Sequence, residues 1–136
     1  MKNKNGFTLV ELLATVVIIA ILGGVATISV NYLIQGGKDD LYKDYENTLK
    51  TEAENYLIEQ MIDGTLSLPR VGESQNIYLS DLIANNKVQN LKDPNGGVCS
   101  AVETYVKVSR GNDNGVNYNL TYETCLVCPN YKTEGC

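Results

Sequence analysis

Apolar residues run almost without interruption from Phe7 to Ile34, and Glu11 is the only charged residue among them. A helix of about 20 apolar residues crosses a bilayer, so this run is long enough to form a membrane-spanning helix. A carboxylate in such a helix is costly, by roughly 2.5–3.5 kcal/mol at the bilayer centre on insertion scales. We therefore expect Glu11 to have a partner.

Beyond this run, apolar residues recur every three or four positions with charged residues between them. This spacing predicts an amphipathic helix that continues the membrane helix and packs its apolar stripe against a globular domain. Gln35–Gly37 is a candidate kink between the two halves, and Asp63-Gly64 is expected to end the helix. The stripe consists of Leu41, Tyr45, Leu49, Ala53, Tyr56, Leu57 and Met61.

The C-terminal part of the chain has the pattern of a small β-sheet. Val102–Val108 and Val116–Glu123 each alternate apolar and polar residues, and the loop between them is rich in Asn and Gly. This pattern predicts a β-hairpin centred near Asp113. Residues 80–85 are expected to form a short helix with Ser80 as its N-cap. With a short third strand, the sheet would lie on the amphipathic helix, which makes the expected fold α+β.

Charge and composition limit the possible functions. The chain of 136 residues has a net charge of −5, which argues against a general nucleic-acid-binding surface. Lys2 and Lys4 precede the apolar run, so the positive-inside rule places the N-terminus in the cytoplasm and the C-terminal domain outside. The absence of histidine removes a common general base and metal ligand. We therefore expect no enzyme activity, no cofactor and no metal site.

All four cysteines lie near the C-terminus, at Cys99, Cys125, Cys128 and Cys136. An even number of cysteines in a small extracytoplasmic domain predicts two disulfides. A hairpin centred near Asp113 places Cys99 opposite Cys125 or Cys128, and the pairing Cys99–Cys128 with Cys125–Cys136 is favoured. A redox-active pair at Cys125 and Cys128 is disfavoured because no βαβ pattern precedes it. A zinc site is disfavoured because it usually needs two close cysteine pairs.

The segment Gly6–Leu13 reads GFTLVELL, follows a short basic leader and opens the long apolar run. In this combination it resembles the processing and methylation signature of type IV pilins and of the pseudopilins of type II secretion and competence systems. The resemblance implies that a prepilin peptidase removes residues 1–6 by cutting after Gly6 and methylates the new N-terminal Phe7. Cleavage there leaves the apolar helix attached, unlike the removal of a secretory signal peptide.

The resemblance also implies a domain organisation and a function. Residues 7–34 would form the transmembrane and assembly helix, and residues 35–136 the extracytoplasmic pilin-like domain. The amine of Phe7 would lie four residues before Glu11, and pairing between neighbouring subunits would set the register of a filament. The implied protein is a structural subunit held in the inner, or cytoplasmic, membrane and polymerised into a cell-surface or periplasmic filament. Its implied partners are other subunits, an assembly ATPase and a platform membrane protein.

A second hypothesis belongs to a different class. The chain could instead be a monomeric, membrane-anchored extracellular binding domain whose nine tyrosines recognise a surface ligand. An intact Met1 on the mature protein would favour this hypothesis, and a methylated Phe7 would favour the filament subunit.

Overall fold

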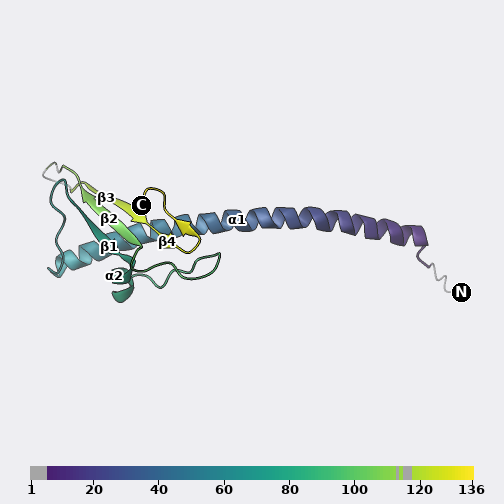
Figure 1. Ribbon diagram of the computed structural model, residues 1–136, viewed down its shortest axis with the longest axis horizontal. Helices are drawn as coiled ribbons and strands as arrows, with labels where there is room; N and C mark the ends of the chain where they lie inside the picture. The colour runs from purple at the N-terminus through teal and green to yellow at the C-terminus, as the bar shows by residue number, and fades with distance from the viewer. Residues whose placement is uncertain (1–5, 113, 115–117) are drawn as a thin grey trace. The chain divides into compact units, whose positions relative to one another are not determined.

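The computed structural model describes residues 6–112, 114 and 118–136, and within residues 23–33 it describes the backbone but not the side chains. Residues 1–5 of the predicted leader and positions 116 and 117 of the predicted hairpin therefore lie outside the described residues. The chain divides into two compact units, one ending at Gly37 and one running from Lys38 to Cys136. Its elements, in order, are α1 (Leu9–Ile62), β1 (Ser74–Tyr78), α2 (Leu79–Ala84), β2 (Tyr105–Arg110), β3 (Leu120–Cys125), β4 (Val127–Cys128) and β5 (Tyr131–Lys132) (Figure 1).

Helix α1 includes Gly36 and Gly37, so these glycines do not end the helix where a kink was considered. The helix ends beside Asp63-Gly64, as the sequence predicts. Gly64 has a φ of 71°, a left-handed conformation that glycine adopts without a steric penalty. The N–H of Thr65 then donates to the carbonyl oxygen of Gln60 at 3.0 Å, which satisfies one of the last carbonyls of the helix.

In the second unit, the C-terminal half of α1 packs on a small antiparallel sheet with the strand order β1-β2-β3, which confirms the predicted α+β fold (Figure 1). Leu49, Ala53 and Leu57 of the predicted stripe are almost completely buried. Tyr42 is also buried, at 2 % exposure, although the stripe was placed one residue earlier. Residues of the sheet and of α2 complete the core: Ile77, Leu79, Leu82, Val106, Val108 and Leu126.

The hairpin forms with a different register from the predicted one. Val106 pairs with Thr124, whereas a hairpin centred near Asp113 would pair it with Leu120. The first strand begins only at Tyr105 because residues 101–103 form a turn, where the N–H of Ser80 donates to the carbonyl oxygen of Ala101 at 2.9 Å. The prediction that this strand starts at residue 102 was therefore wrong.

The short helix is also shifted by one residue. Helix α2 begins at Leu79 with Tyr78 as its N-cap, so the assignment of Ser80 as the cap was wrong. Ser80 is already inside the helix, and the Asp81 carboxylate accepts a hydrogen bond from the N–H of Tyr78 at 3.3 Å. The side chain three residues after the cap therefore satisfies the first free N–H group, as in half of a capping box.

Two disulfides join Cys99 to Cys128 and Cys125 to Cys136. This is the pairing that the sequence favoured, although the register used to argue for it differs from the observed one. Cys99 and Cys128 are buried, whereas Cys136 is exposed. The first bond thus connects the loop before β2 to β4 inside the core, and the second bond ties the C-terminal tail to the end of β3.

A buried carboxylate, Asp93, joins three segments of the second unit. The side chain is 5 % exposed. The hydroxyl of Tyr42 on α1 donates to its Oδ1 at 2.6 Å, and the N–H of Asn95 donates to the same oxygen at 2.7 Å. The N–H of Asn130, in the β4–β5 turn, donates to Oδ2 at 2.8 Å. Burial alone raises the pKa of Asp93, but these hydrogen bonds outweigh it and lower the pKa below its ordinary value.

We expect Asp93 to make the stability of the second unit sensitive to acid. Because the folded-state pKa is lowered, the carboxylate stabilises the fold above the unfolded-state pKa of about 3.9, and this contribution is lost as the pH falls through the folded-state value. The melting temperature of the full chain in detergent, measured from about pH 6 to about pH 2.5, should therefore fall less steeply in Asp93→Asn than in the unaltered protein.

The matched control is Asp63→Asn, because Asp63 is exposed and its carboxylate makes no hydrogen bond or ion pair with the described residues. This control should keep the unaltered acid dependence. Equal slopes for Asp93→Asn and the unaltered protein would contradict the role given to Asp93.

The two disulfides should contribute unequally to stability. Their cysteines are separated by 29 and 11 residues, and in the loop-entropy account the longer loop gives the larger stabilisation. Replacing Cys99 and Cys128 together by serine should lower the free energy of unfolding by roughly 3–4 kcal/mol, and the same change at Cys125 and Cys136 by roughly 2–3 kcal/mol. Urea unfolding of the two double variants tests this order, and a reversed order would contradict it.

Candidate functional site

The peptide bond between Gly6 and Phe7 lies in exposed, non-helical backbone just before α1. The side chain of Phe7 is 76 % exposed. Among the described residues, no atom beyond the chain neighbours lies within 4 Å of the position that a Cβ on Gly6 would occupy. Exposed segments outside secondary structure are where proteases usually cut. The predicted cleavage position is therefore sterically accessible.

Thr8 and Glu11 form a reciprocal cap at the start of α1. The N–H of Thr8 donates to Oε2 of Glu11 at 2.9 Å, and the hydroxyl of Thr8 donates to the same oxygen at 3.0 Å. In return, the N–H of Glu11 donates to Oγ1 of Thr8 at 3.3 Å. This is the capping-box arrangement, which satisfies two free N–H groups of the helix start. The negative charge also lies at the positive end of the helix dipole, which is favourable.

The cap gives Glu11 a partner that the sequence analysis missed. The expected partner was the amine of Phe7 after cleavage, whereas in this single, uncleaved chain the carboxylate is bound by Thr8. The signal was present in the sequence, because a threonine followed three residues later by glutamate, before an apolar run, is typical of a helix start. The single chain therefore holds this acid in place without a counter-charge from another molecule.

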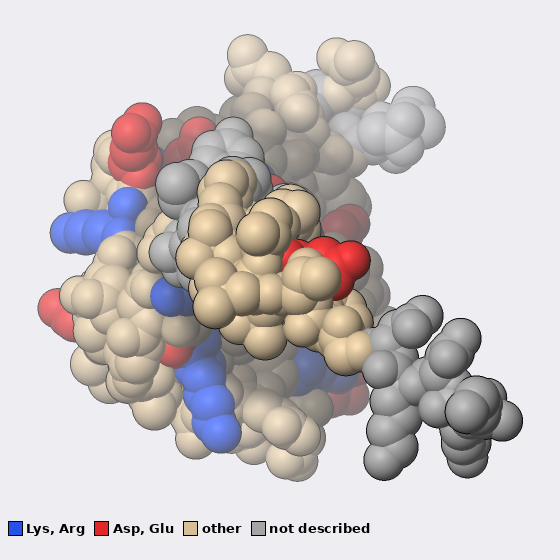
Figure 2. All heavy atoms as spheres, turned by 90° about the vertical axis from the view of Figure 1, so that its right-hand side faces the viewer, with Lys and Arg blue, Asp and Glu red and all other residues tan. Residues whose placement is uncertain are grey.

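The first turns of α1 expose apolar side chains in every direction. Each large apolar side chain from Leu9 to Leu22 is at least half exposed, and Leu9 reaches 82 %. Figure 2, which looks toward the start of α1, shows uncharged side chains over most of this end with an acidic group among them. A helix that is apolar all round is normally covered by lipid or by other protein.

None of the helices, over their described residues, has an apolar stretch of the length that a membrane crossing requires. The side chains of residues 23–33 are outside the described residues. The predicted membrane segment, residues 7–34, therefore lies partly outside them as well.

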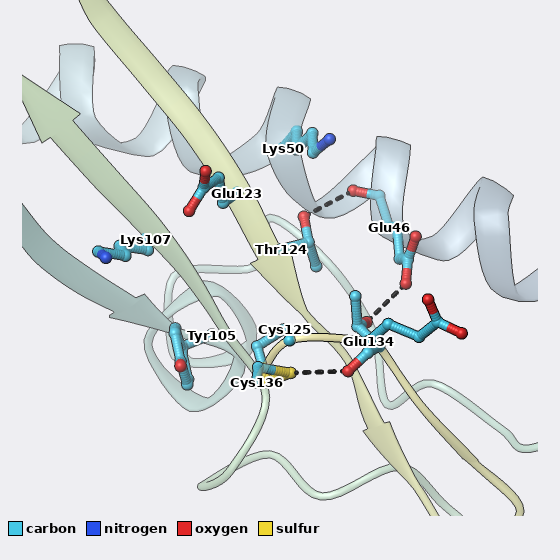
Figure 3. Close-up of a pocket in the computed structure, with 11 residues that line it drawn as sticks. Glu46, Lys50, Tyr105, Lys107, Glu123, Thr124, Cys125, Glu134 and Cys136 are labelled. Atoms are coloured by element: carbon cyan, nitrogen blue, oxygen red, sulfur yellow. Dashed lines mark hydrogen bonds between the residues drawn. A yellow bond between two sulfur atoms is a disulfide. The ribbon is translucent and has the colours of Figure 1, made fainter.

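The second unit contains an open groove of about 460 Å³ between α1, the sheet and the C-terminal tail (Figure 3). Glu46 accepts hydrogen bonds from the hydroxyls of Tyr131 and Thr133, at 2.8 and 2.6 Å, which holds the tail against α1. Burial and the hydrogen bond to Glu46 raise the pKa of Tyr131. The predicted disulfide residues Cys125 and Cys136 also line the groove. Among the described residues, no group of three or more cysteine or acidic side chains could hold a metal ion.

Comparison with known families identifies the N-terminal segment. Residues 1–27 match the family model described as the prokaryotic N-terminal methylation motif. The chain carries the type IV pilin and pseudopilin signal. This match confirms the resemblance noted in the sequence and covers Gly6, Phe7 and Glu11. No curated protein and no solved structure gives a significant match to the chain.

The pilin signal includes both residues of the cap, Thr8 and Glu11. We expect the hydroxyl of Thr8 to stabilise the start of α1. Thr8→Ala should destabilise the first turn by about 0.5–2 kcal/mol, whereas Thr8→Ser keeps a hydroxyl and should change it little. Amide hydrogen exchange of residues 9–12, measured on the full chain in detergent, should therefore be several-fold faster in Thr8→Ala only. Unchanged exchange in Thr8→Ala would show that the cap does not form.

Proposed function

We propose that this chain is the precursor of a structural subunit of a type IV pilus or of a pseudopilus. The observation that carries the proposal is the match of residues 1–27 to the methylation motif. The exposed apolar start of α1 supports it, because such a surface needs other helices or lipid around it. The small disulfide-bonded second unit suits an extracytoplasmic compartment.

In this proposal, a prepilin peptidase cuts the exposed bond after Gly6 and methylates the amine of Phe7. Thr8 keeps its backbone N–H after such a cut, so the cap with Glu11 can persist in the mature subunit. Before assembly, residues 7–34 lie in the cytoplasmic membrane and the second unit lies outside the cell or in the periplasm. The apolar run of the sequence and its basic leader support this topology.

During assembly, the Glu11 carboxylate pairs with the amine of Phe7 on a neighbouring subunit. Opposite charges in a low-dielectric layer attract strongly, and the pair offsets part of the cost of keeping each charge out of water. Because the positions of the two groups along the helix are set, the pair determines how far one subunit is displaced from the next. An assembly ATPase and a platform membrane protein would drive this step. The proposed role of the chain is structural and not enzymatic.

Glu11→Gln separates the charge of this residue from its role in the cap. Glutamine can also complete a capping box, so the variant should insert in the membrane and be cleaved normally. It should nevertheless lose the ion pair, and the yield of filaments sheared from cells should fall by about tenfold or more, since 1.4 kcal/mol corresponds to a factor of ten.

Thr8→Ser is the matched control, because it keeps both the cap and the Glu11 charge, and it should assemble normally. Normal filament yield from Glu11→Gln would contradict the assembly role of the carboxylate. Insertion of the unaltered chain without cleavage and without filaments would instead favour the anchored binding domain.

A further inference from the structure

In the described part of the chain, both outer strands of the sheet have an edge with no paired strand, although α1 covers the part of the β3 edge at Thr124. The strand order β1-β2-β3 leaves one side of β1 and one side of β3 without a neighbouring strand among the described residues. Free edges readily pair with strands of other chains, and many proteins protect them with lysine, proline or a bulge. β1 has the sequence SQNIY, which contains neither lysine nor proline.

The hydrogen bonds that flank the strands show which backbone groups point outward. The N–H of Gly111 donates to the carbonyl oxygen of Asn119 at 2.8 Å. Hydrogen-bonded pairs alternate with non-bonded ones in an antiparallel ladder. It follows from the register of β2 and β3 that the backbone groups of Leu120, Tyr122 and Thr124 point away from β2. Thr124 is buried and its hydroxyl donates to the carbonyl oxygen of Glu46 on α1 at 3.0 Å, so the accessible part of this edge lies at the half-buried Leu120 and Tyr122.

The same argument applies to β1. The N–H of Arg110 donates to the carbonyl oxygen of Glu73 at 3.0 Å, and the N–H of Leu79 donates to that of Thr104 at 2.9 Å. The alternation then turns the backbone groups of Ser74 and Asn76 away from β2. The described residues provide no hydrogen-bond partner for these two outward N–H groups. The side chains of both residues are exposed, so the edge is accessible.

The groove in Figure 3 lies beside the end of β3, over the sheet face that β3 shares with Tyr105 and Lys107 of β2. Glu123, Thr124 and Cys125 of β3 line it on one side. Glu46 and Lys50 of α1 line the other side. Lys50 and Glu123 form no ion pair with the described residues, so no salt bridge closes the groove.

The direction of the strands suits a neighbouring copy of the same chain. β1 and β3 are both antiparallel to β2 and therefore run parallel to each other. Subunits of a filament all point the same way, so β1 of one copy would meet β3 of the next as a parallel pair. A contact between two different surfaces can repeat without closing, which builds an open filament.

We propose that neighbouring copies in the filament join edge to edge, with β1 of one copy added to β3 of the next. The contact rests on the proposed function, because it needs copies held in a common direction. It supplies main-chain hydrogen bonds between the second units, in addition to the contacts between apolar helices. The sheet would then continue from one subunit to the next.

Photo-cross-linking of the full chain in cells that assemble the filament tests this contact. A photoreactive side chain at Thr121, which is exposed on β3, should give a cross-linked dimer in which the attached peptide contains residues 74–78 of a second copy. The same group at Asp63, exposed beyond the end of α1, should not capture that peptide.

Asn76 offers a matched pair of edge variants. Asn76→Pro removes an outward N–H that takes no part in the β1–β2 ladder, and proline is tolerated at such edge positions. It should reduce the Thr121 cross-link by about tenfold, whereas Asn76→Thr keeps the N–H and should leave the cross-link unchanged. Equal melting temperatures of the two variants would show that Asn76→Pro still folds.

The outcomes separate this contact from the proposed function. Filaments that assemble normally but give no Thr121 cross-link to residues 74–78 overturn the edge-to-edge contact and leave the pilin function intact. A cross-link to another segment of the second copy, or to a different protein, also overturns it. A chain that is never processed or polymerised removes both proposals.

Discussion

The placement of one negative charge in an apolar helix is the constraint on which the first unit depends. Glu11 cannot remain unpaired in a surface that excludes water without a large cost in free energy. In the single chain, two hydrogen bonds from Thr8 and the helix dipole reduce that cost. In the proposed filament, the amine of Phe7 on a neighbour would reduce it further, so the same carboxylate would serve first as a helix cap and then as an assembly contact.

In the second unit, a small sheet is held on the C-terminal half of α1. Its core is modest, so hydrogen bonds and covalent links supplement the apolar contacts. Asp93 ties Tyr42 of α1 to the β4–β5 turn through a buried carboxylate, and the ring of Tyr42 stacks on Tyr131 with centroids 4.2 Å apart. Two disulfides connect the same C-terminal segment to the sheet and to the loop before it.

Periodicity predicted the elements better than their boundaries. The spacing of Leu49, Ala53 and Leu57 identified the buried face of α1, because burial repeats with the helical turn. The spacing did not distinguish Leu41 from Tyr42 as the first buried residue, since both lie about one helical turn before Tyr45. A short third strand was expected but not located, because the sequence of β1, SQNIY, lacks a clear apolar alternation. The hairpin register depends on the loop length, which the alternation of the two strands does not determine.

The residues of the candidate site were also only partly predictable from the sequence. Gly6, Phe7 and Glu11 were predicted as site residues because a local motif carries them, and the comparison with known families finds the same motif. Thr8 was within that motif but was overlooked, although its spacing to Glu11 is a known helix-start signal. The role of Asp93 could not be found from the sequence, since its partners Tyr42 and Asn130 come close only in the folded chain.

The mass of the mature N-terminal peptide is the most direct test of the central claim that the chain is processed to expose a new amine near Glu11. The protein isolated from its native membrane should begin at Phe7 and carry one methyl group on the α-amine. A mature protein that still begins at Met1 would contradict the processing, the pairing of Phe7 with Glu11 and the assignment as a filament subunit.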